Sequence, residues 1–156
     1  MVRPGLKDIR IWSRTADNAK RLAAETGARA VTIEEAASAD VVLTVTSAAT
    51  PILQGRWLAK HALVIAVGAT GATLRELDDE VMRTSFIVAE CKAAAERESG
   101  DVRMSGSKVD AEVGTIAAGS TAAPINRRIV FKSVGMAIED LTAATLVWQS
   151  RASESK

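Results

Sequence analysis

Two short runs of apolar and β-branched residues constrain the fold of this chain more than any other feature. Asp40 to Thr46 reads Asp-Val-Val-Leu-Thr-Val-Thr, and Ala62 to Val67 reads Ala-Leu-Val-Ile-Ala-Val. Runs of this kind are typical of strands that are buried on both faces of a parallel sheet. Shorter strands are predicted at Asp8 to Trp12, Ala30 to Thr32, Ser85 to Ala89 and Ile129 to Phe131.

Helices are predicted between these strands. Thr15 and Gly27 are suitable ends for one helix, and Asp78 is a suitable N-cap for another. A closing helix carries an apolar stripe of Val134, Ile138, Leu141, Thr145 and Trp148. Only the region from Val102 to Ala123 lacks a regular pattern. Strands that alternate with helices predict an α/β fold with a mainly parallel sheet.

Composition limits the class of protein. The 156 residues, 47% of them apolar, suffice for one domain with a core, and the net charge of +1 gives no reason to expect nucleic acid or membranes as partners. No apolar run reaches the ~20 residues of a membrane span, and the first residues lack the apolar core of a secretory signal. The single cysteine, Cys91, suits a reducing compartment. These features predict a soluble, cytoplasmic protein.

The carboxyl ends of the strands define the candidate site, because ligands of parallel sheets bind there. The strand ends in question are Ser13 to Thr15, Thr44 to Ser47, Val67 to Gly71 and Ala89 to Cys91. No metal site is predicted, because His61 and Cys91 have no partner at metal-ligand spacing.

Ser13, Arg14 and Thr15 stand where a dinucleotide domain selects between its cofactors. An acidic residue here would bind the ribose 2′-hydroxyl of NAD. An arginine with two hydroxyls and a helix N-terminus can instead hold a 2′-phosphate. The alternative is an ordinary N-cap beside an exposed arginine.

Two further strand ends carry weaker signals. Thr44 and Thr46 could face a ligand, although threonine also simply suits strands. Val67, Gly68 and Ala69 form a loop in which glycine would let a ligand approach the backbone, although a turn without a ligand has the same composition.

Two segments carry a resemblance to a known family. Phe131 to Asp140 reads Phe-Lys-Ser-Val-Gly-Met-Ala-Ile-Glu-Asp, and Glu90 to Asp101 reads Glu-Cys-Lys-Ala-Ala-Ala-Glu-Arg-Glu-Ser-Gly-Asp. Together they resemble the ornithine cyclodeaminase/mu-crystallin family of nicotinamide-dependent enzymes and binding proteins.

The resemblance implies a Rossmann-like domain with helices on both faces of the sheet. It implies an amino acid or cyclic imino acid as substrate and NADP, in preference to NAD, as cofactor, with Ser13, Arg14 and Thr15 similar to the NADPH-using members. It also implies that Glu90 transfers a proton and that Ser133 and Gly135 lie near the nicotinamide. The remaining cofactor-binding residues would be Thr44, Thr46, Val67, Gly68 and Ala69.

The chain departs from the family pattern in several places. Glu90 replaces the usual aspartate and extends the carboxylate by one methylene, and Thr70 replaces an acidic residue. Asn126, Arg127 and Arg128 stand where members usually carry an acidic pair, so the local electrostatics should differ. The family's first strand and Gly-rich loop are not visible before Asp8. Residues 1–152 are therefore interpreted as a partial dinucleotide-binding domain, and residues 153–156 as a loose tail.

Three functional hypotheses follow. In the first, the chain is the cofactor domain of a family enzyme, incomplete as an enzyme in itself. In the second, it is a truncated, non-catalytic module that forms homo-oligomers through an uncovered closing helix and binds nucleotide weakly or not at all. In the third, the loop from Gly68 to Gly71 has taken over the binding of phosphate.

Overall fold

The computed structural model describes residues 7–154, and the side chains of residues 7–151. The first four elements of the described chain are β1 (Arg10–Ile11), α1 (Ala16–Thr26), β2 (Arg29–Ala30) and α2 (Ile33–Ala37). The elements that follow are β3 (Val41–Thr44), η1 (Gly55–Trp57), β4 (Leu63–Ala66), α3 (Asp79–Thr84), β5 (Phe86–Ala89), α4 (Lys92–Glu98), α5 (Gly100–Ser105), β6 (Ala111–Glu112), α6 (Val113–Ala117), β7 (Ile129–Lys132) and α7 (Ala137–Glu154). Residues 1–6, at the start of the predicted partial domain, and residues 155–156 of the predicted tail lie outside the described residues.

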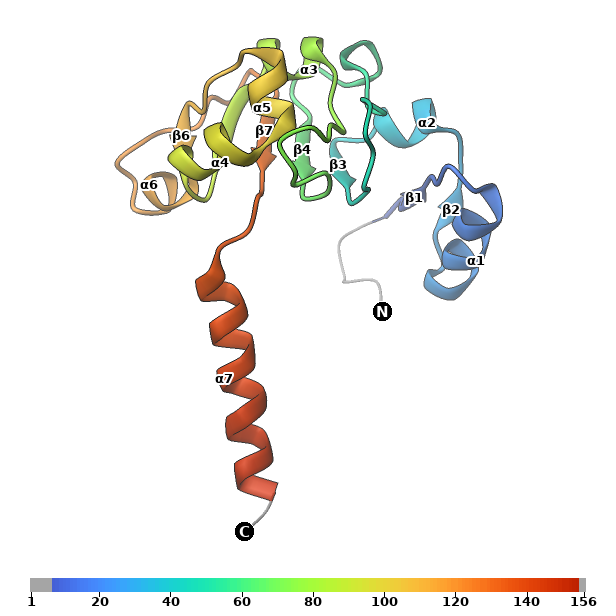
Figure 1. Cartoon of the computed structure of the whole chain (residues 1–156). Coiled ribbons are helices and arrows are strands. Elements are labelled where there is room, and N and C mark those ends of the chain that lie inside the picture. Colours follow the sequence, from blue (N-terminus) through green and yellow to red (C-terminus); the bar gives the residue numbers. More distant parts are fainter. Residues whose placement is uncertain (1–6, 155–156) are drawn as a thin grey trace.

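The strands form two parallel sheets (Figure 1). In one, β1 pairs with β2; in the other, five strands follow the order β3-β4-β7-β5-β6. The last strand of the chain thus lies in the middle of the larger sheet, with Val130 opposite Val64 on one side and Ile87 on the other. Because every pair is parallel, the carboxyl ends of all five strands meet one edge. The predicted α/β fold with a mainly parallel sheet is confirmed.

Local signals set two of the helix ends that the sequence predicts. Gly27 ends α1 with a φ of 72°, in the left-handed region that glycine enters readily. The Asp78 carboxylate caps α3 by accepting a hydrogen bond from the Val81 N–H. Thr15 has the extended backbone of an N-cap, but its side chain makes no capping hydrogen bond. The region from 102 to 123 is more regular than expected, since it contains most of α5 together with β6 and α6.

The core lies on one face of the larger sheet. Val42, Val64 and Val130 are side by side on neighbouring strands and are between 0% and 8% exposed. The residues that cover them come from η1, α3, α5 and the adjoining segments: Leu53, Leu58, Leu77, Val81, Met82 and Val102.

The opposite face of β3 is open. Val41, Leu43 and Val45 are 53%, 59% and 67% exposed. The prediction that the run from Asp40 to Thr46 is buried on both faces is therefore wrong for the structure described. The physical reason is that no element within residues 7–154 packs on that face of β3.

The closing helix α7 extends away from the sheet (Figure 1). All side chains from residue 136 to residue 151 are exposed, with Leu141 62% and Trp148 76% exposed. The predicted apolar stripe is thus uncovered in this structure. Val134 is not part of it, because α7 begins only at Ala137. No helix within residues 7–154 is both long and apolar enough to span a membrane.

Candidate functional site

The predicted site residues of four adjacent strands meet at the carboxyl edge of the larger sheet. Thr44 ends β3, Val67 follows β4, Ser133 follows β7 and Glu90 follows β5. The sheet order places these strands side by side. In an open parallel sheet this edge is where ligands bind.

Glu90 lies beside the turn that follows β7. Val88 is opposite Phe131, and Glu90 and Ser133 are each two residues beyond that pair. The Glu90 side chain is half-buried, and its Oε2 is buried without a hydrogen-bond partner among the described residues. A buried carboxylate oxygen without a partner is unfavourable. This oxygen can therefore gain from accepting a hydrogen bond from a ligand.

The turn from Ser133 to Met136 leads from β7 into α7. The Ser133 Oγ accepts a hydrogen bond from the Gly135 N–H at 3.3 Å. Gly135 has a φ of 77°, a conformation in which a side chain would be strained. Glu139 Oε2 accepts from the Met136 N–H at 3.1 Å and so stabilises the first turn of the helix. This turn is fixed by its own residues, next to Glu90.

Thr44 and Thr46 use their hydroxyls within the protein. Thr44 Oγ1 donates to Glu76 Oε2 at 2.8 Å, and Thr46 Oγ1 donates to Glu76 Oε1 at 2.7 Å. The Thr46 N–H donates to the same Oε1 at 2.6 Å. Glu76 is fully buried, and these hydrogen bonds satisfy its carboxylate. The sequence pattern does not predict that Glu76 belongs to this edge of the sheet.

The loop from Val67 to Ala69 is held against the end of β3. The Ala69 N–H donates to the Thr46 carbonyl oxygen at 2.7 Å. A Cβ at Gly68 would lie 2.2 Å from that same carbonyl oxygen and 2.5 Å from Glu76 Oε1. The space beside Gly68 is therefore filled by Thr46 and Glu76, and glycine is required there for packing.

A second buried carboxylate, Asp101, lies below the same edge. Its Oδ1 accepts from the N–H groups of Glu76 and Leu77, both at 2.9 Å. Its Oδ2 lies 3.4 Å from Lys132 Nζ, and both side chains are 0% exposed. Burial raises the pKa of the Asp101 carboxyl, against the opposing effect of these hydrogen bonds and of the Lys132 ammonium. The signal for this pair in the sequence is a lysine at the end of an apolar strand.

Ser13, Arg14 and Thr15 lie apart from these residues. They follow β1, whose sheet lies to one side of the larger sheet, beyond β3 (Figure 1). Within residues 7–154, no hydrogen bond or ion pair joins the three to the other predicted site residues. The Arg14 side chain is exposed, and it makes no hydrogen bond or ion pair with a described residue.

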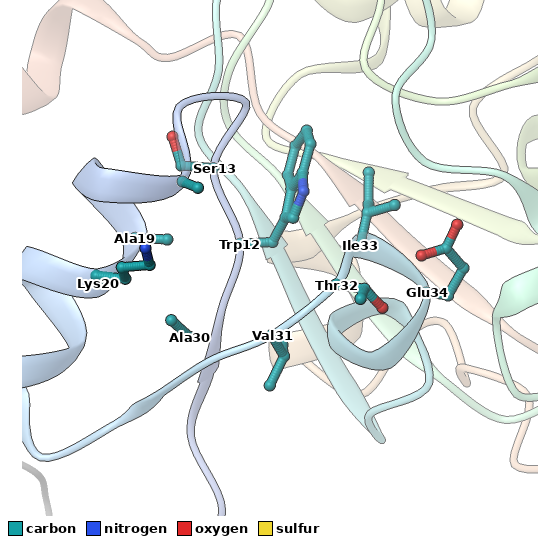
Figure 2. Close-up of a pocket in the computed structure, with 10 residues that line it drawn as sticks. Trp12, Ser13, Ala19, Lys20, Ala30, Val31, Thr32, Ile33 and Glu34 are labelled. Atoms are coloured by element: carbon teal, nitrogen blue, oxygen red, sulfur yellow. The ribbon is translucent and has the colours of Figure 1, made fainter.

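A cavity of about 380 Å³ adjoins Ser13. Figure 2 shows Trp12 and Ser13 on opposite sides of the backbone, with Trp12 on the side of Ile33 and Ser13 on the side of α1. The walls are mainly apolar, with Lys20 and Glu34 as the charged residues. Arg14 itself does not line this cavity.

Arg127 and Arg128 lie at the opposite edge of the sheet, before the start of β7. Arg127 donates to the carbonyl oxygen of Ser85, and Arg128 is buried and donates to that of Gly55. The two guanidiniums thus bind backbone groups at the amino edge. The predicted difference in local electrostatics therefore concerns this amino edge, and it stays a prediction.

Among the described residues, His61 and Cys91 belong to no group of three metal-binding side chains. His61 is exposed, with Nε2 at 3.4 Å from Asp40 Oδ1, and Cys91 is half-buried. The structure from residue 7 to residue 154 contains no group of three metal-binding side chains.

Comparison with models of known protein families identifies the family of this chain. The model of the ornithine cyclodeaminase/mu-crystallin family matches residues 2–155. The chain belongs to this family. The ketimine reductase mu-crystallin of Mus musculus is 43% identical over 148 residues, which are 92% of this chain and 47% of that protein. A Delta(1)-pyrroline-2-carboxylate reductase of Bacillus thuringiensis is 33% identical over 126 residues, which are 74% of this chain and 38% of that protein.

Solved structures of the family share the fold. The Delta(1)-pyrroline-2-carboxylate reductase of Thermococcus litoralis, in complex with NADH and L-proline, matches with a TM-score of 0.84 and 27% identity. The match covers 96% of this chain and 51% of that one. The predicted Rossmann-like fold is thereby confirmed. The chain spans about half the length of the curated relatives it matches.

Proposed function

We propose that this chain is the NADP(H)-binding domain of a reductase that acts on cyclic imino acids. The observation that carries the proposal is the unpartnered buried oxygen of Glu90 beside the Ser133 turn, at the ligand-binding edge of the sheet. The proposal is supported by relatives named as ketimine and pyrroline-carboxylate reductases.

The residues present suit a nicotinamide cofactor at two places. A reduced nicotinamide supplies a hydride for the carbon of an imine. Ser133 and Gly135 would border the nicotinamide, and Val67 to Ala69 would border the adjoining ribose. Glu90 would hold the proton that the substrate nitrogen takes up during reduction. Arg14, exposed and with no described partner, would bind the 2′-phosphate with the help of Ser13 and Thr15.

Titration of the whole chain with NADPH and NADH, followed by cofactor fluorescence, tests the proposal. Saturable binding that prefers NADPH, together with reduction of a cyclic imino acid such as pyrroline-2-carboxylate, is the expected result. Failure to bind either cofactor would contradict it.

Replacement of Arg14 by leucine is expected to weaken NADPH binding by ~10- to 100-fold and to leave NADH binding within about twofold. The loss corresponds to charge-assisted hydrogen bonds to a phosphate that NADH lacks. The dissociation constants of both cofactors should be measured. Arg21→Leu is the matched control, because Arg21 is an exposed arginine of the adjoining helix α1. Equal losses for both cofactors would assign Arg14 another role.

We infer a second candidate function, a non-catalytic module that self-associates, from the exposure of α7. Ile138, Leu141 and Trp148 are 56%, 62% and 76% exposed on one side of an extended helix. Apolar surface of this kind favours contact with a partner. A homodimer that binds neither cofactor and reduces no imino acid would favour this candidate over the first.

Light scattering of the chain is expected to give at least a dimer mass. The double variant Leu141→Glu/Trp148→Glu should be monomeric, because two charges would have to be buried in the contact. Ala143→Glu adds a charge to the opposite side of the same exposed helix and should leave the mass unchanged. A wild-type chain that is monomeric at high concentration would exclude self-association through α7.

A further inference from the structure

The ends of β3, β4 and β7 are joined by one buried network of charged side chains. Its members are Glu76, Asp101 and Lys132, and all three are 0% exposed. They come from separate parts of the chain and meet below the edge of the sheet that holds the predicted cofactor loops.

Lys132 connects the loop after β4 to the strand before the Ser133 turn. Its Nζ donates to the Gly68 carbonyl oxygen at 2.6 Å and lies 3.4 Å from Asp101 Oδ2. Lys132 immediately precedes Ser133, so its backbone position fixes where that turn begins. One side chain thereby ties two of the predicted cofactor segments together.

Asp101 and Glu76 extend the connection to β3. Asp101 Oδ1 holds the backbone of Glu76 and Leu77, and the Glu76 carboxylate holds both hydroxyls of Thr44 and Thr46. The close approach of Gly68 to Thr46 and Glu76 closes the network. Each bond joins residues at least 24 positions apart, so no local turn would keep these loops together in its place.

We propose that Lys132 is a positioning residue which, with Asp101 and Glu76, holds the loop from Val67 to Ala69 in its binding conformation before any ligand arrives. Burial of three charged groups is unfavourable unless each one has a partner of opposite charge or a hydrogen-bond partner. Such a network therefore favours the single conformation in which all its members are paired. A loop ordered in advance lowers the entropy lost on binding. The consequence for affinity rests on the proposed function, whereas the holding of the loop does not.

Amide hydrogen exchange of the full chain without cofactor tests the holding of the loop. In Lys132→Met, which keeps the apolar part of the side chain, the amides of Gly68, Ala69 and Thr46 should exchange at least tenfold faster than in the wild type. Helix α3 leads into the start of β5, at the amino edge of the sheet. The exchange rates of its amides should change by less than threefold. Equal acceleration throughout, or no acceleration in the loop, would overturn the proposal.

Asp101→Asn is the second variant, in case Lys132→Met does not fold. Asparagine retains an oxygen acceptor for the Glu76 and Leu77 N–H groups, and it replaces the charged oxygen that faces Lys132 by an NH2 group, which cannot accept from the ammonium. The same amides of the loop should exchange at least fivefold faster, with those of Glu76 and Leu77 still protected. Unchanged exchange in the loop would contradict the role given to the network.

Cofactor titration separates this inference from the proposed function. If the wild type binds NADPH, Lys132→Met should raise the dissociation constant at least tenfold. Ile87→Val, a core substitution outside the network, should leave it unchanged. A wild type that binds neither cofactor contradicts the proposed function, while the exchange data still decide whether the network holds the loop.

Discussion

Replacement of Glu90 by glutamine is expected to lower the rate of imino acid reduction by ~100- to 10,000-fold, the usual contribution of a positioned proton-transfer group. Glutamine keeps the size and the acceptor oxygen of Glu90 but cannot carry the proton that the substrate nitrogen requires. The dissociation constant of NADPH should change by less than about threefold, since the carboxylate acts on the substrate. Measurement of kcat together with cofactor affinity tests both parts.

Glu112→Gln is the matched control for this experiment. Glu112 ends β6, the strand beside β5, and is half-buried like Glu90. Its Oε1 accepts a hydrogen bond from the Lys92 N–H at 2.8 Å. The amide oxygen of glutamine can accept the same hydrogen bond. Equal losses in the two variants would point to a general effect on this edge of the sheet and would remove Glu90 from the proposed chemistry.

Glu90→Asp addresses the length of the side chain. The family resemblance implies an aspartate at this position, and a shift of about 1 Å in a reacting group can change a rate by ~100-fold. If the chain retains the family's geometry, the aspartate variant should be faster than the wild type. A slower aspartate variant would show that the site is arranged around the longer glutamate.

The sequence predicts the order and type of most elements because their signals are local. A glycine sets the end of α1, an aspartate sets the start of α3, and the apolar runs at β3 and β4 are strands as expected. The burial of β3 could not be predicted in the same way. Its pattern is that of a strand covered on both faces, but coverage depends on which elements pack on each face. In the structure described, no element covers the face that carries Leu43, which is 59% exposed.

The predicted site likewise combines features that local signals predict with features that depend on contacts in space. Thr44, Val67, Glu90 and Ser133 are brought to one edge because parallel strands end together. What the side chains do there depends on contacts between distant residues. The Thr44 hydroxyl binds Glu76, 32 residues away, and Lys132 binds Gly68, 64 residues away. Periodicity carries no information about such pairs, so the buried network could not be predicted from it.

The family motif around Ser99, Gly100 and Asp101 is explained by packing. The Ser99 hydroxyl accepts from the Val102 N–H, Asp101 holds the backbone of Glu76, and Gly100 lies against Leu74. This motif positions α5 beneath the loop that carries Glu76. Asp101 also lies 3.4 Å from Lys132 at the end of β7, so the motif supports the edge of the sheet from below.

Replacement of Gly100 by alanine is therefore expected to destabilise the protein by about 3 kcal/mol, the upper part of the range for overpacked cores. A Cβ at this position would lie 2.2 Å from the Leu74 carbonyl oxygen and 2.9 Å from the Leu74 nitrogen. Both are backbone atoms next to the segment that Asp101 holds, so neither can move aside without breaking hydrogen bonds. The melting temperature should fall by about 6 to 12 °C for a chain of this size.

Gly114→Ala is the matched control, with the opposite expected sign. Gly114 lies in α6, and a Cβ there would meet no atom within 4 Å. Alanine in a helix is favoured over glycine by ~0.5 to 1 kcal/mol, because glycine loses more backbone freedom on folding. Thermal unfolding of both variants should thus show one decrease and one small increase. A Gly100→Ala variant as stable as the wild type would mean that α5 does not approach Leu74 as closely as described, and with it the position of Asp101 beneath the candidate site would fail.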